Sequence, residues 1–269
     1  MTNTGAERRL TALLDQVRTV HQDDHLLVLD KPSGLPTTSP RGGEWCLVDL
    51  ARRLDPDAPR LHPSSRLDRP VSGLVTFART ARGTQALLAA RRAGSYHRTY
   101  LAVALPGPAP PSGRWTWTID RDPRDDRLRR AVAEGEEARP RRRGEGGGAP
   151  LDRRRPRGRR PLPAETRFEV EARAGPGGGE AARLTLWPVT GRTHQLRVHA
   201  AQAGAPLFGD VAYGGARRQV LADGAVITAR RVLLHCAEVT IPDPVTGAPI
   251  TFRSPAPDDL EAVWSRLAG

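Results

Sequence analysis

Residues 64–74, SSRLDRPVSGL, place one carboxylate between two arginines just before an apolar run. Asp68 is the acid, and Arg66 and Arg69 flank it. The proline and glycine favour a turn that leads into a strand at 73–80. An isolated R-x-D-R pattern is typical of an exposed turn, where an ion pair contributes only about 0–1 kcal/mol. The alternative is a reactive carboxylate at Asp68. The motifs elsewhere in the sequence distinguish an exposed turn from a reactive site.

The stretches on either side of this loop alternate between strand and helix signals. HLLVLDKPSGLP at 25–36 predicts a buried strand that runs into a proline- and glycine-rich loop. TQALLAARRAG at 84–94 predicts a helix that ends at its glycine. YHRTYLAVAL at 96–105 alternates, which predicts a strand with one polar, accessible face. That face carries Tyr96, Arg98 and Tyr100.

Hairpin signals dominate the rest of the chain. Further strands are predicted at 115–120, 165–174, 182–189 and 231–242, and a hairpin at 244–255 around 246–247. Helices are predicted at 10–17 and after Pro257, where Asp258 would cap an amphipathic segment. Because hairpins outnumber strand–helix–strand units, the sequence predicts an α+β protein with a mixed, largely antiparallel sheet.

TGRTHQLRVHAAQAG at 190–204 predicts a turn followed by a helix. One interpretation is an ordinary amphipathic helix with its aliphatic residues buried. The other is an anion-binding site, because basic side chains gather where a helix N-terminus favours negative charge. The basic cluster consists of Arg192, His194, Arg197 and His199. His194 and Arg197 are three residues apart and are expected to share one helix face.

The formal net charge of +12 over 269 residues suggests a polyanionic partner, but the charge is unevenly distributed. Residues 139–160 hold ten arginines against two acids, a net of +8, and the rest of the chain carries only +4. The stretch 139–162 is rich in Arg, Gly and Pro without periodicity, which predicts a flexible insertion. This segment is either a flexible linker whose arginines reflect overall composition, or a basic arm that binds RNA nonspecifically. Lys31 is the only lysine, so arginines count as evidence by position and not by number.

The sequence offers no support for a metal protein or a membrane protein. Cys46 and Cys236 form no CxxC pair, and no cysteine–histidine cluster has zinc spacing. No run approaches the about 18 apolar residues of a membrane span. Residues 1–20 form a polar lead-in without a signal peptide. A reduced, cytoplasmic protein is therefore predicted.

Taken in order, five stretches resemble the RluA-type pseudouridine synthases. They are 25–36, 66–74, 98–107, 190–215 and 233–260. The resemblance implies a mixed sheet in two subdomains, flanked by helices and crossed by a catalytic cleft. It also implies isomerisation of uridine in RNA to pseudouridine, without a cofactor or metal. Residues 21–269 would form one catalytic domain without an N-terminal S4 domain, because the chain starts too close to the first strand.

The same resemblance assigns roles to individual residues. Asp68 matches the catalytic aspartate, and Arg197 matches the basic residue that pairs with it. Arg66 matches the arginine that takes the space of the flipped nucleotide, and Tyr100 matches the tyrosine that stacks on the target base. The remaining candidates for RNA binding, from their place at the helix start, are Arg192 and His194.

These residue types suit the chemistry. A carboxylate can attack the sugar or stabilise its cation while the glycosidic bond is open. An arginine partner opposes the desolvation that disfavours a charged carboxylate in a closed pocket. Extruding the nucleotide costs a few kcal/mol, and stacking on an aromatic ring contributes about 1–3 kcal/mol per base. Whether Asp68 attacks C1′ or assists elimination stays open at this point.

Two positions depart from the family pattern. Ser65 stands where the family usually has histidine, and Val71 where it usually has threonine. These departures keep open an alternative: a non-catalytic RNA-binding or ribosome-assembly factor with the same fold. A carboxylate-dependent glycosidase is less favoured, because it needs two opposed carboxylates. The RNA target is left open between rRNA and tRNA, and a monomer is assumed.

Overall fold

The computed structural model describes residues 4–39, 44–132, 161–175, 181–221 and 223–269. The predicted insertion at 139–162 lies outside the described residues except for its last two.

The helices are α1 (Thr4–Leu14), α2 (Leu47–Leu54), α3 (Ala81–Ala93), α4 (Gln195–Gln202), α5 (Asp258–Ala268) and the short 3-10 helix η2 (Val211–Tyr213). The strands of the first half are β1 (Arg18–Gln22), β2 (Leu26–Lys31), β3 (His62–Pro63), β4 (Ser72–Ala78), β5 (His97–Ala104), β6 (Ser112–Trp115), β7 (Thr118–Arg121) and β8 (Arg129–Val132). The later strands are β9 (Thr166–Ala174), β10 (Ala181–Pro188), β11 (Arg218–Val220), β12 (Val226–Thr228), β13 (Leu234–Pro242) and β14 (Pro249–Arg253).

Within the described residues, ten strands form one main sheet in the order β1-β2-β4-β13-β5-β10-β9-β6, with β3 beside β4 and β14 beside β13. All of its described pairs are antiparallel except β4 with β13. Two small hairpins, β7–β8 and β11–β12, stand apart from the main sheet. The prediction of an α+β protein with a largely antiparallel sheet is confirmed.

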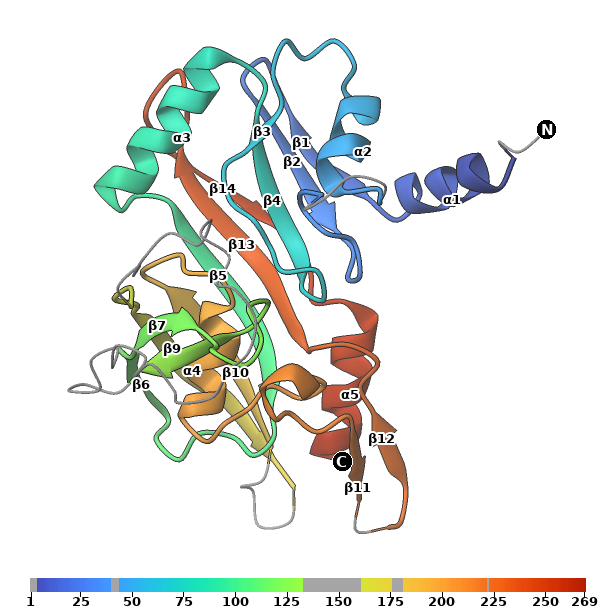
Figure 1. The fold of residues 1–269 in the computed structure, drawn as a ribbon, viewed down its shortest axis with the longest axis vertical. Helices are drawn as coiled ribbons and strands as arrows, with labels where there is room; N and C mark the ends of the chain where they lie inside the picture. Colours follow the sequence, from blue (N-terminus) through green and yellow to red (C-terminus); the bar gives the residue numbers. More distant parts are fainter. Residues whose placement is uncertain (1–3, 40–43, 133–160, 176–180, 222) are drawn as a thin grey trace, which may run out of the picture.

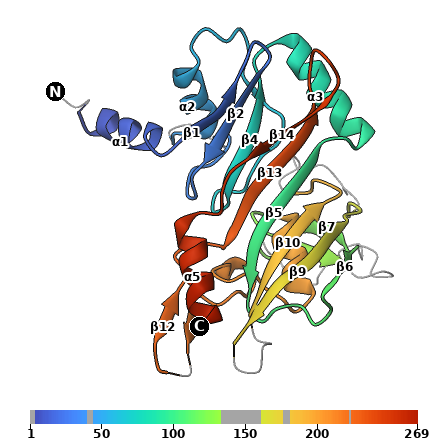
Figure 2. The ribbon, with the colours of Figure 1, turned by 180° about the vertical axis from the view of Figure 1, so that it is seen from behind.

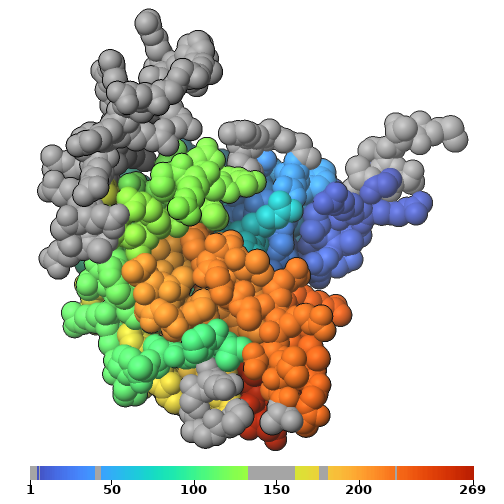
Figure 3. Space-filling view, turned by 60° about the horizontal axis from the view of Figure 1, so that its bottom comes forward, coloured from blue at the N-terminus to red at the C-terminus, as the bar shows by residue number. Residues whose placement is uncertain are grey.

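The sheet joins two halves of the molecule (Figure 1). One half carries β1, β2 and β4 with α1 and α2, and the other carries β9 and β10 with α4 and the β7–β8 hairpin. The long strands β13 and β5 cross between the halves, as the opposite view also shows (Figure 2). In Figure 3 the orange surface of α4 and the residues after it lies next to the blue-to-cyan surface of the N-terminal part. Residues far apart in sequence therefore share one face.

Burial explains the central strands. Every residue of β4 is buried, and so is every residue of β2 except Asp30, as expected for near-continuous apolar runs at the centre of a sheet. Gly73, at the second position of β4, has a φ of 114° and lies against the backbone of Cys236 on β13. A Cβ atom at this position would overlap that backbone. Glycine therefore permits the one parallel pairing, directly after the Asp68 loop.

Several predicted boundaries were wrong in detail. The N-terminal helix covers 4–14 instead of 10–17, because the chain turns into β1 at Arg18. The strand predicted at 115–120 is divided between β6, which pairs with the main sheet, and β7, which pairs with β8. The hairpin around 246–247 is formed by β13 with β14. At α5 the cap position belongs to Pro257, and Asp258 is the first helical residue.

Candidate active site

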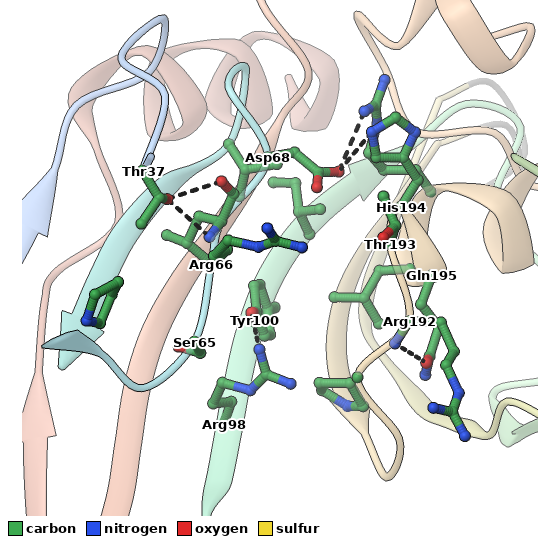
Figure 4. A pocket seen from close by; sticks show the side chains of 18 of the residues that line it. Thr37, Ser65, Arg66, Asp68, Arg98, Tyr100, Arg192, Thr193, His194 and Gln195 are labelled. Carbon is green, nitrogen blue, oxygen red and sulfur yellow. Dashed lines mark hydrogen bonds and ion pairs between the residues drawn. The ribbon is translucent and has the colours of Figure 1, made fainter. Parts of the chain in front are cut away.

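A pocket of about 560 Å³ opens between the two halves of the sheet. It is lined by the loop that follows β3, by β5 beneath it, and by the loop that connects β10 to α4. In Figure 4, Arg66 and Asp68 reach into the pocket from one side and His194 from the other, while Tyr100 lies on the strand between them. The pocket thus unites stretches that the sequence separates by more than a hundred residues.

Hydrogen bonds from the loop after β2 fix the backbone on both sides of Asp68. Thr37 Oγ1 donates to the carbonyl of Leu67 at 2.9 Å and accepts its N–H at 3.1 Å. Lys31 Nζ, which is fully buried, donates to the carbonyls of Leu35 at 2.8 Å and Arg69 at 3.4 Å. Burial lowers the pKa of Lys31 to about 7, and the charge of Asp68 opposes this shift. The carboxylate is therefore presented from a tethered loop.

Asp68 meets Arg197 across the pocket. Arg197 Nη1 lies 3.2 Å from Asp68 Oδ2, and the guanidinium is only 7% exposed. A second acid, Asp210, holds Arg197 more closely, with two contacts of 2.7 Å, and is 2% exposed. Burial alone would lower the pKa of Arg197, but the hydrogen bonds and charges of Asp210 and Asp68 outweigh it and raise that pKa. The arginine is thus a fixed positive charge between two carboxylates.

Asp210 and Tyr213 are site residues that the sequence interpretation missed. Both lie in GDVAYGG at 209–215, a stretch that contributes to the resemblance but received no role. Gly209 has a φ of 86° and lies against the carbonyl of Arg231, where a Cβ atom would overlap. This turn aims Asp210 at Arg197, and it places the Tyr213 ring 4.8 Å from the guanidinium carbon of Arg197. The glycine–aspartate pair was the available signal.

His194 also faces the carboxylate. Its Nε2 atom lies 3.9 Å from Asp68 Oδ2, and its Nδ1 atom lies 2.6 Å from Tyr213 Oη. The residue precedes α4 with a φ of 58°. Burial is the main reason that the pKa of His194 is lowered. His194 precedes α4, so it does not share a helix face with Arg197 as predicted, but both residues face Asp68.

Tyr100 lines the pocket, but its predicted accessibility was wrong. Its side chain is buried, with 4% of the residue exposed, because it packs into the main hydrophobic core cluster. The hydroxyl group accepts a hydrogen bond from Arg98 at 3.2 Å. Burial raises the pKa of Tyr100 well above its ordinary value, and the charge of Arg98 opposes this effect. A neutral phenol ring therefore forms part of the pocket wall.

The two arginines beside Asp68 differ in their surroundings. Arg66 is exposed, lines the pocket, and has no hydrogen-bond or ion-pair partner among the described residues. Arg69 makes two contacts of 2.7 and 3.1 Å with Glu44 and donates to the carbonyl of Gly34. Arg66 is the arginine that can bind a ligand. Arg192 is half-buried in the pocket wall, where it donates to the carbonyl of Pro163.

The departures at positions 65 and 71 are accommodated locally. Ser65 is buried, and its hydroxyl lies 3.3 Å from Tyr96 Oη. The same phenol oxygen lies 2.9 Å from the hydroxyl of Ser64 and 2.7 Å from that of Thr76. Val71 is buried in the core, and its N–H donates to the carbonyl of Asp68. Both positions support the loop, and both also contribute to the lining of the pocket.

A second groove, of about 880 Å³, adjoins the pocket at the ends of β5, β6, β9 and β10. We call it the strand-end groove. Its arginines are Arg91, Arg98, Arg114, Arg167 and Arg192, and Trp187 also lines it. Arg91, Arg98 and Arg192 belong to both the groove and the pocket. None of the described residues that line the groove is acidic.

The described part of the chain offers no metal centre and no membrane segment. Within it, histidine, cysteine, aspartate and glutamate form no group of three that could hold a metal ion. None of the helices in the described ranges has the length and apolar character needed to cross a bilayer.

Comparisons with known proteins show the family to which the chain belongs. The family model described as RNA pseudouridylate synthase matches residues 25–202. The ribosomal large subunit pseudouridine synthase D of Xanthomonas campestris pv. campestris is 35% identical over 92% of this chain and 68% of its own length. The ribosomal large subunit pseudouridine synthase C of Escherichia coli (strain K12) is 29% identical over 97% of this chain and 72% of its own length.

The fold also has a counterpart among solved structures. The structure of human RNA pseudouridylate synthase domain containing 4 has a TM-score of 0.68 and 22% identity, and the match covers 98% of this chain and 97% of that one. This likeness supports the two-halved mixed sheet as the fold.

Proposed function

We propose that Asp68 is the catalytic carboxylate of this chain, which belongs to the RNA pseudouridylate synthase family and isomerises uridine in RNA to pseudouridine. The observation that carries the assignment is the 3.2 Å contact between Asp68 and Arg197 in one pocket, although 129 residues separate them. Both belong to stretches that resemble the family's motifs. The alternative of a non-catalytic RNA-binding factor is not favoured.

The reaction changes bonds but not composition. The bond from N1 to C1′ breaks, the uracil turns, and a bond from C5 to C1′ forms. C5 loses a proton, and N1 gains one. Asp68 either bonds to C1′ or stabilises the sugar while the base is detached. Arg197, held by Asp210, keeps a fixed charge beside Asp68 and orients its carboxylate.

The target nucleotide has to leave its stack before the pocket can take it. Arg66 is exposed at the pocket edge without a partner among the described residues, so its guanidinium can fill the space that the nucleotide vacates. Tyr100 provides the aromatic wall for the uracil. Arg66 therefore holds the target nucleotide out of its stack, whereas Tyr100 contacts the uracil base in the pocket.

Large-subunit ribosomal RNA is the proposed substrate, because the relatives that match most of this chain are named for it. The strand-end groove supports binding of the flanking backbone, since its arginines continue from the pocket without an intervening acidic side chain among the described lining residues. Phosphate contacts of this kind position RNA without reading its sequence. Transfer RNA is the competing substrate.

A cytoplasmic monomer with one catalytic domain at 21–269 completes the proposal. Cell fractionation tests the location, and size-exclusion chromatography with light scattering tests the oligomeric state. A stable dimer at assay concentrations would contradict the monomer.

The decisive variant is Asp68→Asn, which keeps the size of the side chain and removes its charge. Pseudouridine formation on unmodified large-subunit rRNA should fall by at least about 10³-fold, in the range seen when a group essential to covalent or acid–base chemistry is lost. Carbodiimide treatment followed by primer extension locates the product, and filter binding checks that RNA affinity is kept.

The matched control is Asp126→Asn, an exposed acid outside the pocket, which should remain fully active. Activity of Asp68→Asn near that of the control would overturn the assignment. Equal conversion of a tRNA transcript would overturn the substrate proposal but not the role of Asp68.

A further inference from the structure

A chain of hydrogen bonds ends at the imidazole that faces Asp68. The backbone N–H of Arg129 on β8 donates to Tyr213 Oη at 3.0 Å. Tyr213 Oη in turn lies 2.6 Å from His194 Nδ1. On the far side of the imidazole ring, Nε2 lies 3.9 Å from Asp68 Oδ2. Three elements thus converge on one histidine.

These hydrogen bonds favour one position for the proton of a neutral His194 ring. The Tyr213 oxygen already accepts the N–H of Arg129, so its own proton is free to donate, and His194 Nδ1 is the acceptor within reach. An accepting Nδ1 leaves the hydrogen of a neutral imidazole on Nε2. That N–H is on the side of the ring that faces Asp68.

The surroundings of His194 favour the neutral ring. The charged and titratable groups that face it are Asp68, Asp210, Arg129, Arg197 and Tyr213. The two acids favour the imidazolium and the two arginines oppose it, so burial decides the balance. Burial is the largest cause of the lowered pKa of His194. The ring is thus uncharged at neutral pH.

The backbone of His194 is held in an uncommon conformation. Its φ of 58° is the only positive φ of a residue other than glycine among the described residues. The left-handed region is unfavourable for most side chains, and such residues gather at functional sites. Here the conformation starts α4 and places the imidazole between Tyr213 and Asp68.

We propose that His194 is a positioning residue, a neutral imidazole whose Nε2–H is held toward Asp68 by Tyr213 as a second donor beside Arg197. This rests on Asp68 being the catalytic carboxylate. The separation of 3.9 Å is longer than a hydrogen bond, and distances of this kind often shorten when substrate closes a site. The competing role is a charged histidine that binds an RNA phosphate.

The tautomer can be measured directly. In protein labelled with ¹⁵N-histidine, the two ring nitrogens have distinct chemical shifts when neutral, and comparison with His194→Asn assigns the signals of His194 among the seven histidines. At pH 7 we expect Nε2 to carry the hydrogen and Nδ1 to be bare. Tyr213→Phe removes the donor to Nδ1 and should allow the other tautomer. A wild-type ring protonated on Nδ1, or on both nitrogens, would overturn the proposal.

Kinetics separate positioning from phosphate binding. His194→Asn suits the left-handed backbone, but its amide is too short to reach Asp68. Its kcat should fall about 10- to 100-fold, the range of one hydrogen bond to a charged group, with KM almost unchanged. In this variant the fall in rate at low pH should begin at a higher pH than in the wild-type protein. His194→Gln, whose amide nitrogen falls near the position of Nε2, should recover a large part of kcat.

The matched control is His62→Asn on β3, which is exposed and lies outside the pocket. It should leave kcat and KM unchanged. A raised KM with unchanged kcat in His194→Asn would show phosphate binding instead. Failure here is distinguishable from failure of the proposed function, because the activity of Asp68→Asn and the tautomer of His194 are measured independently.

Discussion

The role of an arginine in this protein depends on where it lies. The comparison is between Arg197, which is buried in the pocket, and Arg114 and Arg167, which are exposed in the strand-end groove. Arg197 is 7% exposed and has carboxylate contacts of 2.7 and 3.2 Å. Arg114 and Arg167 are 61% and 54% exposed, and both lie 3.5 to 3.6 Å from one acid, Glu165. The first is locked in place, and the other two keep donors for a ligand.

The difference follows from the cost of desolvation. A charge taken out of water needs partners with good geometry, so Arg197 is neutralised by protein and orients Asp68. An exposed guanidinium keeps its hydration and pairs only weakly, so a phosphate can compete for it. Changes to Arg197 and its partner acids should therefore alter the stability of the protein and kcat. Changes in the strand-end groove should alter RNA affinity and its salt dependence.

The largest effect is expected from Asp210→Asn, which leaves the buried Arg197 with Asp68 as its only close acid among the described residues. Breaking a buried pair in this way costs about 3–5 kcal/mol of unfolding free energy. Urea denaturation measures this loss. In the control, Glu238→Gln removes the acid that pairs with Arg253, an arginine that is 73% exposed, and it should cost about 0–1 kcal/mol. Equal losses would break the comparison, because burial would then not decide the role of an arginine.

The next effect is expected at Tyr100. Tyr100→Ala removes the aromatic wall, and kcat/KM should fall about 5- to 150-fold, the equivalent of the 1–3 kcal/mol of stacking on one base. Tyr100→Phe keeps the ring and should stay within about threefold of wild type, because the hydroxyl points to Arg98. Steady-state kinetics on a short RNA measure both. A large loss in Tyr100→Phe would show that the hydroxyl matters and not the stacking.

Arg66→Ala should give a smaller effect that depends on the RNA. On a folded substrate, kcat/KM should drop about tenfold, because nothing then fills the space of the extruded nucleotide, whose unstacking costs a few kcal/mol. An unstructured oligonucleotide should be converted almost as fast as by wild type. Arg69→Ala is the neighbouring control, since Arg69 pairs with Glu44. The same loss on both substrates would argue against a role in holding the nucleotide out.

The smallest effect is expected from the double variant Arg114→Ala and Arg167→Ala in the groove. RNA affinity should fall a few-fold at low salt, and the salt slope should decrease by roughly one for each phosphate that the variant no longer binds. kcat should be unchanged. Arg266→Ala, an exposed arginine on α5, is the control. An unchanged slope would remove the groove from the RNA path.

Much of the fold could be predicted from local patterns. The alternation at 165–174 and 182–189 predicted the paired strands β9 and β10, and Gly94 in a left-handed conformation ends α3 as expected. The division of 115–120 between β6 and β7 could not be predicted, because it depends on which strand each segment pairs with. The alternation of side chains along a strand shows which residues share a face, but it does not show which strands pair with it.

The site was predictable to a similar degree. The order of the motifs made Asp68, Tyr100 and Arg197 the site candidates, and Asp68 and Arg197 are in contact in the structure. The burial of Tyr100 was missed, because it results from core packing with residues that are distant in sequence. Asp210 received no role although the glycine–aspartate pair at 209–210 was a signal, because only the folded structure shows its ion pair with Arg197.

By itself, the sequence determined the class of fold, the order of the motifs and the candidate for the reactive acid, since apolar periodicity, turn residues and residue chemistry are local properties. The tertiary structure decided which arginine is buried, which acid holds it and which nitrogen of His194 faces Asp68. These choices depend on desolvation and on distances of a few ångströms between segments that lie 13 to 129 residues apart in sequence. Those quantities exist only once the chain has folded.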